Sequence, residues 1–267
     1  MDEEAAPQSA DERYSEPRAQ RARDRERKVR PAYYAARSGF FRDWWTLLHP
    51  PYTAWFLSYV VIGASLAPRV ELSRLLYSVL AFFLAVGLSA HALDELHGRP
   101  LRTQIPSVVL VVVALLGILG ALILGVVGIH QIGWLLLPFM CIGPLILVAY
   151  NLELFGGAVH NDVTFALAWG AFPLLTGYIG ETGHLALAPV IAAIGAAALS
   201  FAQRSLSTPA RFIRRHVTNV EGILTLSDGQ NLTLDQNVLL APLERTLRAT
   251  SWSIICLAAA IAVARLS

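Results

Sequence analysis

The chain has 267 residues, of which 55% are hydrophobic and 15% are charged, and its formal net charge is +2 at pH 7. The apolar residues form blocks about as long as the ~20 residues that a helix needs to cross a bilayer. This composition excludes an ordinary water-soluble globular domain. We predict an all-α, multi-pass membrane protein with membrane lipids as partners and no nucleic-acid partner.

The chain begins with a polar segment, residues 1–38. Most of it is rich in Arg, Glu, Asp, Ala and Pro, and such a sequence buries too little apolar area to offset chain entropy. We therefore predict a disordered basic tail. The aromatic residues that follow, Phe40, Phe41, Trp44 and Trp45, predict an amphipathic helix lying in the membrane interface.

About seven apolar segments come next, and we interpret each as a membrane span. They cover residues 52–67, 72–93, 104–128, 132–152, 162–180, 185–203 and 251–266. The first and the last are short, so full crossing is an open question for both. The predicted organisation is a transmembrane bundle at 39–203, a non-membrane segment at 204–250 and a C-terminal transmembrane helix at 251–267.

Basic residues predict the orientation, because short loops rich in Lys and Arg stay on the cytoplasmic side. The tail, the loop after the second span and the segment after the sixth span are all basic. The loops at 129–131 and 180–183 contain no Lys or Arg. We predict a cell-membrane protein with its N-terminus in the cytoplasm.

Within the segment at 204–250, residues 222–234 alternate polar and apolar side chains around Asp228 and Gly229. An Asp-Gly pair between alternating stretches is the strongest short-range signal for a hairpin. A small cytoplasmic β-hairpin is therefore expected near the C-terminus. Residues 238–248 have the pattern of an amphipathic helix leading into the last span.

A first group of polar residues emerges directly from the second span. Carboxylates at membrane depth cost several kcal/mol unless they are paired or bound, so this group is a candidate site. If the helix stops at Gly98, a favoured residue just past a helix end, then His91, Asp94 and Glu95 share one helical face. His97 lies about one turn beyond Asp94.

The chemistry of this first group suits a phosphorylated ligand. Oxygen ligands such as those of Asp94 and Glu95 are preferred by Mg²⁺, which clamps a diphosphate and neutralises its charge. The guanidinium groups of Arg99 and Arg102 match phosphate oxygens. The alternative is a set of interfacial charges solvated by water.

A second polar group lies between the fourth and fifth spans, and it comprises Tyr150, Asn151, Glu153, His160, Asn161 and Asp162. Either Asn161 or Asp162 could instead cap the following helix. Because two acidic loops lie on one membrane face, we expect a shared site with Glu153 and Asp162 as further metal ligands. Alternatively, His91, His97 and His160 join the carboxylates to hold a transition metal, which imidazole suits better than it suits Mg²⁺.

At these residues the chain resembles the UbiA superfamily of membrane prenyltransferases. The likeness lies in His49–Pro51, in the motif at Leu93–Leu101 that ends in Arg-Pro-Leu, and in the glycine-containing apolar stretch at Phe165–Tyr178. It covers about residues 45–205. The resemblance implies a helical bundle whose cavity opens toward the lipid and whose loops hold Mg²⁺ and an isoprenyl diphosphate. The prenyl cation would then alkylate an acceptor.

The resemblance also implies roles for single residues. Asp94 would match a metal-binding aspartate with Glu95 as its neighbouring carboxylate, and Arg99 and Tyr150 would match an arginine and a tyrosine of the family. Together with the chemistry of the two polar groups, we predict Asp94 and Glu95 as catalytic and metal-binding, and Arg99, Arg102, Tyr150 and Asn151 as substrate-binding. The chain departs from the family because its first motif has one aspartate, and because Arg204–Arg215 stands where a second Asp-rich motif belongs. Two hypotheses follow. One is a divergent prenyltransferase, and the other is an inactive UbiA-like scaffold that binds a lipid or quinone.

Overall fold

The computed structural model describes residues 31–36 and 39–267. The predicted disordered tail at 1–38 therefore lies largely outside the described residues, but its residues 31–36 belong to the folded structure. Ala32 and Ala35 are buried there. The hydroxyl group of Tyr34 is 2.9 Å from Nδ1 of His49, at the entry to the bundle.

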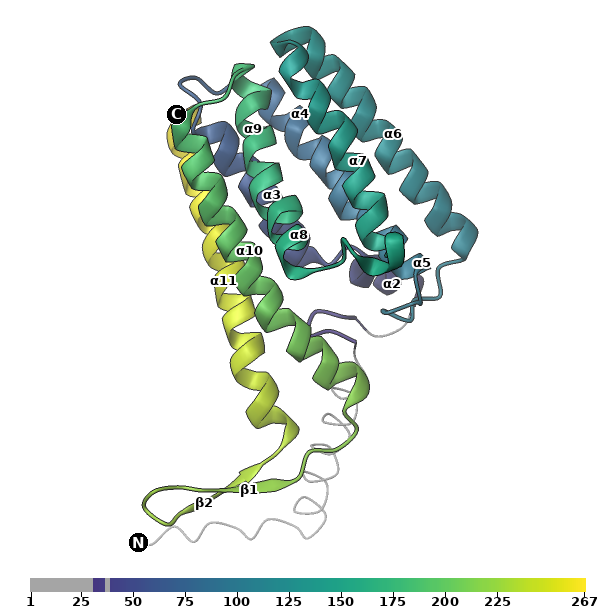
Figure 1. Cartoon of the computed structure of the whole chain (residues 1–267), viewed down its shortest axis with the longest axis vertical. Coiled ribbons are helices and arrows are strands. Elements are labelled where there is room, and N and C mark those ends of the chain that lie inside the picture. The colour runs from purple at the N-terminus through teal and green to yellow at the C-terminus, as the bar shows by residue number, and fades with distance from the viewer. Residues whose placement is uncertain (1–30, 37–38) are drawn as a thin grey trace, which may run out of the picture.

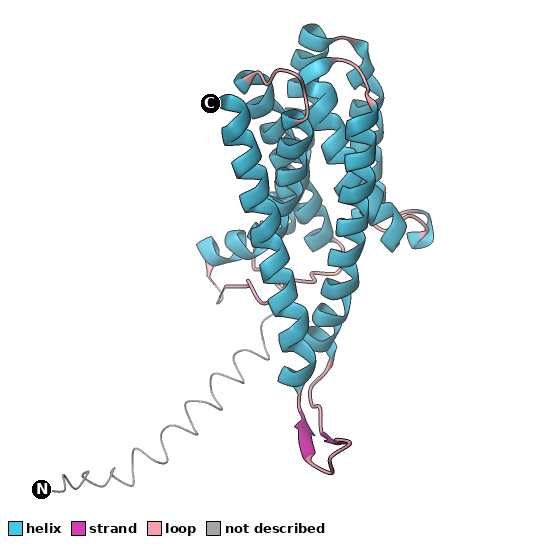
Figure 2. Cartoon of the chain, turned by 90° about the vertical axis from the view of Figure 1, so that its left-hand side faces the viewer, coloured by secondary structure: helices cyan, strands magenta, loops and turns pink. Residues whose placement is uncertain are grey.

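The described part of the chain is a helical bundle with one small β-hairpin (Figures 1 and 2). Six helices in it are long and apolar enough to cross a membrane, which confirms the multi-pass membrane class; they are Leu72–Leu96, Ser107–Ile132, Trp134–Asn151, Asp162–Thr182, Leu187–His216 and Gln236–Leu266. Large apolar side chains such as Leu115 and Leu116 are exposed on the outer face of the second of them. Lipid is the environment that such a surface needs.

Several of these long helices are composite. The first joins three segments, α4 (Leu72–Phe82), η1 (Phe83–Ala90) and α5 (His91–Leu96). The fourth joins α8 (Asp162–Ala166), η4 (Leu167–Ala171) and α9 (Phe172–Thr182). The others are α6 (Ser107–Ile132), η2 (Trp134–Leu136) with α7 (Leu137–Asn151), α10 (Leu187–His216) and α11 (Gln236–Leu266). Helix α3, described below, and the short helices α2 (Phe40–Leu47) and η3 (Phe155–Gly157) complete the set.

Both η1 and η4 are π-helical. Such wide turns within α-helices are frequent at functional sites, and here each lies close to a predicted polar group. In η1, the hydroxyl of Ser89 donates to the carbonyl of Ala114 in α6 at 2.9 Å. The wide turns thus shape the interior next to the candidate site.

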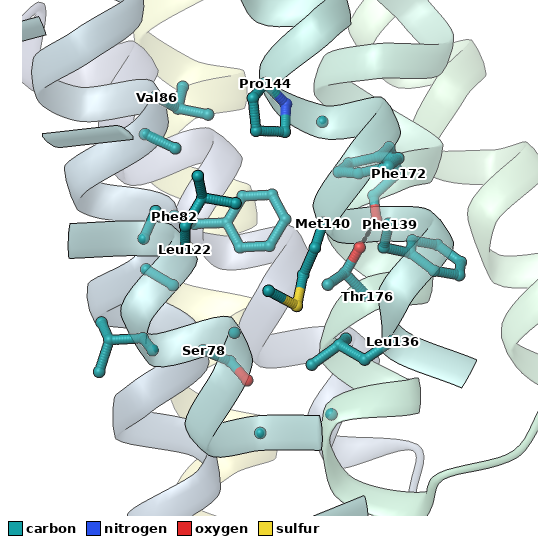
Figure 3. A pocket seen from close by; sticks show the side chains of 18 of the residues that line it. Ser78, Phe82, Val86, Leu122, Leu136, Phe139, Met140, Pro144, Phe172 and Thr176 are labelled. Atoms are coloured by element: carbon teal, nitrogen blue, oxygen red, sulfur yellow. Dashed lines mark hydrogen bonds between the residues drawn. The ribbon is translucent and has the colours of Figure 1, made fainter. Parts of the chain in front are cut away.

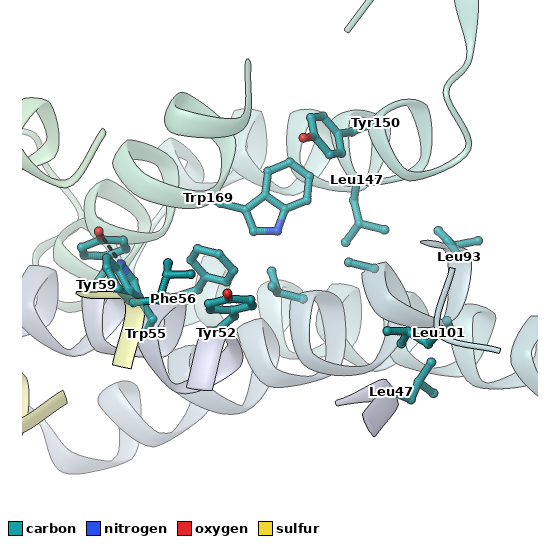
Figure 4. Packing of buried hydrophobic residues seen from close by; sticks show 14 of the residues in the cluster. Leu47, Tyr52, Trp55, Phe56, Tyr59, Leu93, Leu101, Leu147, Tyr150 and Trp169 are labelled. Atoms are coloured by element: carbon teal, nitrogen blue, oxygen red, sulfur yellow. Dashed lines mark hydrogen bonds between the residues drawn. The ribbon is translucent and has the colours of Figure 1, made fainter. Parts of the chain in front are cut away.

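The predicted first span corresponds to α3 (Pro50–Ser65), which has 16 residues. It is shorter than the six spanning helices and lies inside the bundle, against α9 and α11. Trp55 and Tyr59 are each 1% exposed, and the indole of Trp55 donates to the hydroxyl of Tyr59 at 2.6 Å. Aromatic residues of α3 thereby form much of the core (Figure 4). The predicted count of seven spans is not confirmed.

A difference from prediction concerns the sixth apolar segment, which we expected to end at residue 203. Helix α10 instead continues to His216, and α11 begins at Gln236, so the pair extends beyond the bundle (Figure 1). In this extension Arg214 and Glu244 form a buried ion pair, with Nη2 and Oε2 2.8 Å apart. Pairing with α11 therefore keeps the polar end of α10 helical.

The predicted hairpin is confirmed as a two-stranded antiparallel sheet. Strands β1 (Gly222–Thr225) and β2 (Asn231–Leu234) pair in register from Gly222 opposite Leu234 to Thr225 opposite Asn231. The turn contains Gly229 at φ +83°, a left-handed conformation that glycine adopts without strain. The hairpin lies at the far end of the α10–α11 extension (Figure 2).

Candidate functional site

The two predicted polar groups meet at one end of the bundle, which we call the loop end and define by residues 94–106, residues 150–162 and Arg204. Glu153 joins the two loops: its Oε2 is 3.7 Å from Nε2 of His97, and its Oε1 is 3.8 Å from Nδ1 of His160. Since the Glu153 side chain is about half exposed, these pairs position the loops more than they stabilise them. The predicted shared location of the two groups is thus observed.

Tyr150 and Arg204 form the centre of the loop end. The Arg204 guanidinium donates to the Tyr150 hydroxyl through Nη1 and to Oδ1 of Asp162 through Nε. It also lies over the rings of Tyr150 and Phe165, at 5.6 and 5.1 Å from their centroids. The His160 ring stacks on Tyr150 at 4.3 Å. An aromatic wall therefore carries a cation at its rim.

Asp162 is engaged by this cation and does not cap its helix. The cap of α8 is Asn161, whose side-chain oxygen accepts from the backbone N–H of Thr164 at 2.9 Å. Asp162 instead lies 2.5 Å from Nε of Arg204. Arg204 was not among the predicted site residues, although its distance of seven and eleven residues from Arg211 and Arg215 places all three on one helical face.

Glu95 serves the structure of its own loop. It is completely buried. Its Oε1 accepts hydrogen bonds from the backbone N–H and the hydroxyl of Thr103, at 2.8 and 2.9 Å, and its Oε2 accepts from the N–H of Leu101 at 2.9 Å. Both oxygens predicted to bind a metal are therefore occupied by the segment that follows.

Asp94 faces another direction and is partly buried. It interacts electrostatically with Arg211 and Arg215 of α10 and with His160. No hydrogen bond to its carboxylate is found among the described residues. Of the carboxylates at the loop end, Asp94 is therefore the one left available to a ligand.

The predicted substrate-binding residues divide between two locations. Arg99 donates to the carbonyl of Ile105 at 2.6 Å and to the hydroxyl of Ser107 at 2.5 Å, so it closes the entry to α6. Arg102 is exposed on the same loop. Asn151 is buried, and its amide donates to the carbonyl of Leu147 at 2.7 Å. Tyr150 alone of the predicted set contacts the central arginine.

His91 belongs to a second aromatic contact. Its Nδ1 is 3.0 Å from the carbonyl oxygen of Gly87, and its ring stacks on His49. Burial lowers the pKa of His49 well below its ordinary value, and His91, Arg211 and Arg215 lower it further. Burial also raises the pKa of Tyr34, against the opposing effect of the same two arginines. His49 and Tyr34 are thus neutral groups facing the arginine side of α10.

The donor set does not fit the predicted Mg²⁺. In the described part of the chain, no group of three or more His, Cys, Asp or Glu residues is placed to hold a metal ion. Glu95 is bound to its own loop, Asp162 to Arg204, and Glu153 lies between two histidines. Magnesium and the alternative transition metal stay predictions from the sequence.

A cavity of about 140 Å³ lies between α4, α6, α7 and α9. Its lining is predominantly apolar, and Figure 3 shows Phe82, Met140 and Phe172 around it. Toward the loop end the wall includes Leu147 and Trp169. The Trp169 ring is 4.5 Å from that of Tyr150 (Figure 4).

The cavity and the loop-end polar residues are thus separated by a single aromatic layer. This arrangement suits an amphiphile whose chain occupies the cavity and whose charged head lies at the loop end. Comparison with known proteins finds no family model that matches the chain, no matching curated protein and no matching solved structure.

Proposed function

We propose that this chain is a divergent UbiA-like membrane protein that binds an isoprenyl diphosphate, or a related lipid phosphate, as a prenyltransferase substrate. The observation that carries the proposal is the apolar cavity of about 140 Å³, which ends one aromatic layer from the Tyr150–Arg204 pair. With the N-terminus in the cytoplasm of a cell-membrane protein, the loop end would face the cytoplasm. A charged substrate would enter from that side.

The cavity contributes to selectivity through its shape. Moving a methylene group from water into an apolar site gains about 0.8 kcal/mol, but lipid tails are already as apolar as a leucine side chain. The hydrocarbon chain of a lipid that moves from the bilayer into the cavity therefore gains little free energy from the hydrophobic effect. Recognition of the charged head at the loop end must supply most of the specificity.

The aromatic wall suits a reaction through a cationic intermediate. In prenyl transfer the allylic C–O bond breaks, the electron pair leaves with the diphosphate, and the acceptor then forms a bond to carbon and loses a proton. The rings of Phe165 and Trp169 are stacked, 5.4 Å apart and 7° from parallel. Aromatic faces stabilise a neighbouring cation. Asp94, the available carboxylate, would accept the proton of the acceptor.

A second candidate, a lipid- or quinone-binding protein without catalysis, is favoured by the engagement of the carboxylates. Glu95 accepts three hydrogen bonds from its own loop, and Asp162 is paired with Arg204. Such a site binds a ligand yet has few groups free to assist bond cleavage. The two candidates share the cavity and differ in turnover.

Radiolabelled farnesyl diphosphate, added with a membrane extract to the full-length protein in lipid nanodiscs, separates them. We expect a labelled prenylated product, with loss of at least tenfold in rate for Asp94→Asn. Binding without product would favour the non-catalytic candidate. The absence of both binding and product would overturn the proposal.

Two matched variants test the role of the cavity. Leu122 of α6 lines the cavity, so Leu122→Trp should occupy it and weaken binding of farnesyl diphosphate. Leu116 lies on the same helix, is 61% exposed and does not line the cavity, so Leu116→Trp should leave binding unchanged. Equal binding of farnesyl diphosphate by both variants would show that the prenyl chain of the ligand does not occupy this cavity.

A further inference from the structure

We propose that the phosphate head group of the lipid is held directly by the arginine row of α10, which we define as Arg204, Arg211 and Arg215, without a bridging metal ion. The inference rests on the proposed function, because it assumes that the ligand is a lipid phosphate. It adds how the head group is recognised and which residues recognise it.

The row is a geometric consequence of helix α10. Residues seven and four apart return to the same face of an α-helix, and α10 is helical throughout this stretch. The contacts agree with this spacing: Arg204 reaches Tyr150 and Asp162, whereas Arg211 and Arg215 both interact electrostatically with Asp94. The row therefore faces the loop end.

The charges along the row do not balance. Arg204 is neutralised by Asp162. Arg215 makes a hydrogen bond to the carbonyl of Pro31 at 3.4 Å, and no ion pair to Arg211 or Arg215 is found among the described residues. Asp94 is the carboxylate that both interact with most directly, since Glu95 is turned toward its loop. Two guanidinium groups thus face one carboxylate, which leaves a net positive charge that favours a bound anion.

A buried nitrogen at the same place also lacks a partner. His49 is 5% exposed, its Nδ1 is next to the Tyr34 hydroxyl, and its Nε2 has no hydrogen-bond partner in the described part of the chain. Buried polar atoms in proteins are nearly always satisfied. His49 also interacts electrostatically with Arg211 and Arg215, so this unpartnered nitrogen belongs to the same region as the two arginines.

The chemistry of arginine explains how a metal becomes dispensable. A guanidinium group presents five N–H donors in a planar fork that matches two phosphate oxygens, and it carries its charge without an ion. The row also occupies the part of the chain where the resemblance would place a second set of metal-binding aspartates. Carboxylates there would require a cation to bind a diphosphate, whereas arginines bind it directly.

Equilibrium binding of radiolabelled farnesyl diphosphate to the full-length protein in phosphatidylcholine nanodiscs tests the inference. We expect the same Kd, within twofold, in Mg²⁺ and in EDTA. Arg211→Gln should raise the Kd at least tenfold in both buffers, because it removes a charged fork and breaks no hydrogen bond found in the described part of the chain. Arg211→Lys keeps the charge and loses the fork, so its Kd should lie between those of the unaltered protein and Arg211→Gln.

Matched controls keep the test specific. Arg245 is an exposed arginine of α11, so Arg245→Gln should bind farnesyl diphosphate like the unaltered protein. Without ligand, all variants should have the same thermal unfolding midpoint as the unaltered protein. Inorganic pyrophosphate should compete weakly and farnesol should bind at least tenfold less tightly, which separates recognition of the free anion from recognition of the lipid.

The outcomes distinguish the inference from the proposed function. Binding that disappears in EDTA, or that Arg211→Gln leaves unchanged, would overturn the arginine-held head group while the lipid-phosphate function stands. Farnesol binding as tightly as the diphosphate would also overturn it. No binding of either compound, with or without Mg²⁺, would remove the proposed function itself.

Discussion

The imidazole rings of His49 and His91 lie face to face, with centroids 4.3 Å apart and planes 15° apart. This contact joins the start of α3 to the junction between η1 and α5. His49 has a left-handed backbone conformation, with φ +46°, which is uncommon for a residue other than glycine. The stack therefore fixes the entry of α3 at a position of backbone strain.

Acidification should destabilise the protein through His49. Its pKa is lowered in the folded state, chiefly by burial, whereas the unfolded chain takes up a proton near pH 6.5. The unfolded state thus binds more protons. The contribution of neutral His49 to the free energy of unfolding is therefore fully present above about pH 6.5 and decreases as the pH drops below that value. Thermal unfolding midpoints in detergent at pH 8.0 and 5.5 measure the effect.

The variant His49→Asn isolates this contribution. Asparagine tolerates a left-handed conformation better than most residues and does not titrate in this range. We expect a lower midpoint at pH 8.0 but a smaller decrease between pH 8.0 and 5.5 than in the unaltered protein. An equal decrease in both proteins would assign the acid sensitivity to other groups.

Helices α3 and α9 cross in close backbone contact, and a methyl group there should be costly. A Cβ atom at Gly177 would lie 2.3 Å from the carbonyl oxygen of Val60. Gly177→Ala should therefore destabilise the protein by about 1–3 kcal/mol, the usual cost of overpacking. Gly195→Ala is the control, because a Cβ atom there meets nothing within 4 Å. Chemical denaturation of both variants in mixed micelles provides the comparison.

Removing the Glu95 carboxylate should loosen the loop at 97–106. Glu95→Ala leaves the backbone N–H groups of Leu101 and Thr103 without their acceptor, at a cost of about 1–3 kcal/mol for each buried group. Hydrogen exchange should accelerate at these two amides and remain unchanged in the hairpin at 222–234. Unchanged protection of Leu101 and Thr103 would show that the loop holds without this carboxylate.

Removing one partner of the buried ion pair between Arg214 and Glu244 should destabilise the protein more than replacing both partners. Glu244→Leu leaves a guanidinium that is 3% exposed without its carboxylate, and breaking such a pair costs about 3–5 kcal/mol. The double variant Arg214→Met with Glu244→Leu should regain most of that loss, because two apolar residues can replace a buried pair. Thermal unfolding of the single and double variants tests both statements.

Local signals allowed part of the fold to be predicted. Asp228 and Gly229 sufficed for the hairpin, since a tight turn depends on neighbouring residues. Gly98 predicted a helix ending at His97, and the helix ends one residue earlier, at Leu96. The extension of α10 escaped prediction because Arg214 is helical through its pairing with Glu244, thirty residues later. No pattern in the sequence around Arg214 indicates that Glu244 is its partner.

The candidate site was predictable by location and less so by role. The charged residues after the second and fourth spans do converge, through Glu153. Asp94 and Glu95 are neighbours with the same chemistry, yet one is available and the other accepts hydrogen bonds from Leu101 and Thr103. The way in which the next loop folds back determines which of the two carboxylates it hydrogen-bonds. Neither helix propensity nor hydrophobic periodicity predicts that fold of the loop.

The length of α10 determines where a ligand would meet the arginine row. At about 1.5 Å per residue, Arg211 lies about 36 Å along the helix from Leu187, just past a hydrocarbon core that is about 30 Å thick. That height matches the plane of phospholipid phosphates. An amphiphile could therefore slide sideways out of its own leaflet into the protein, with its charged end never leaving the hydrated layer.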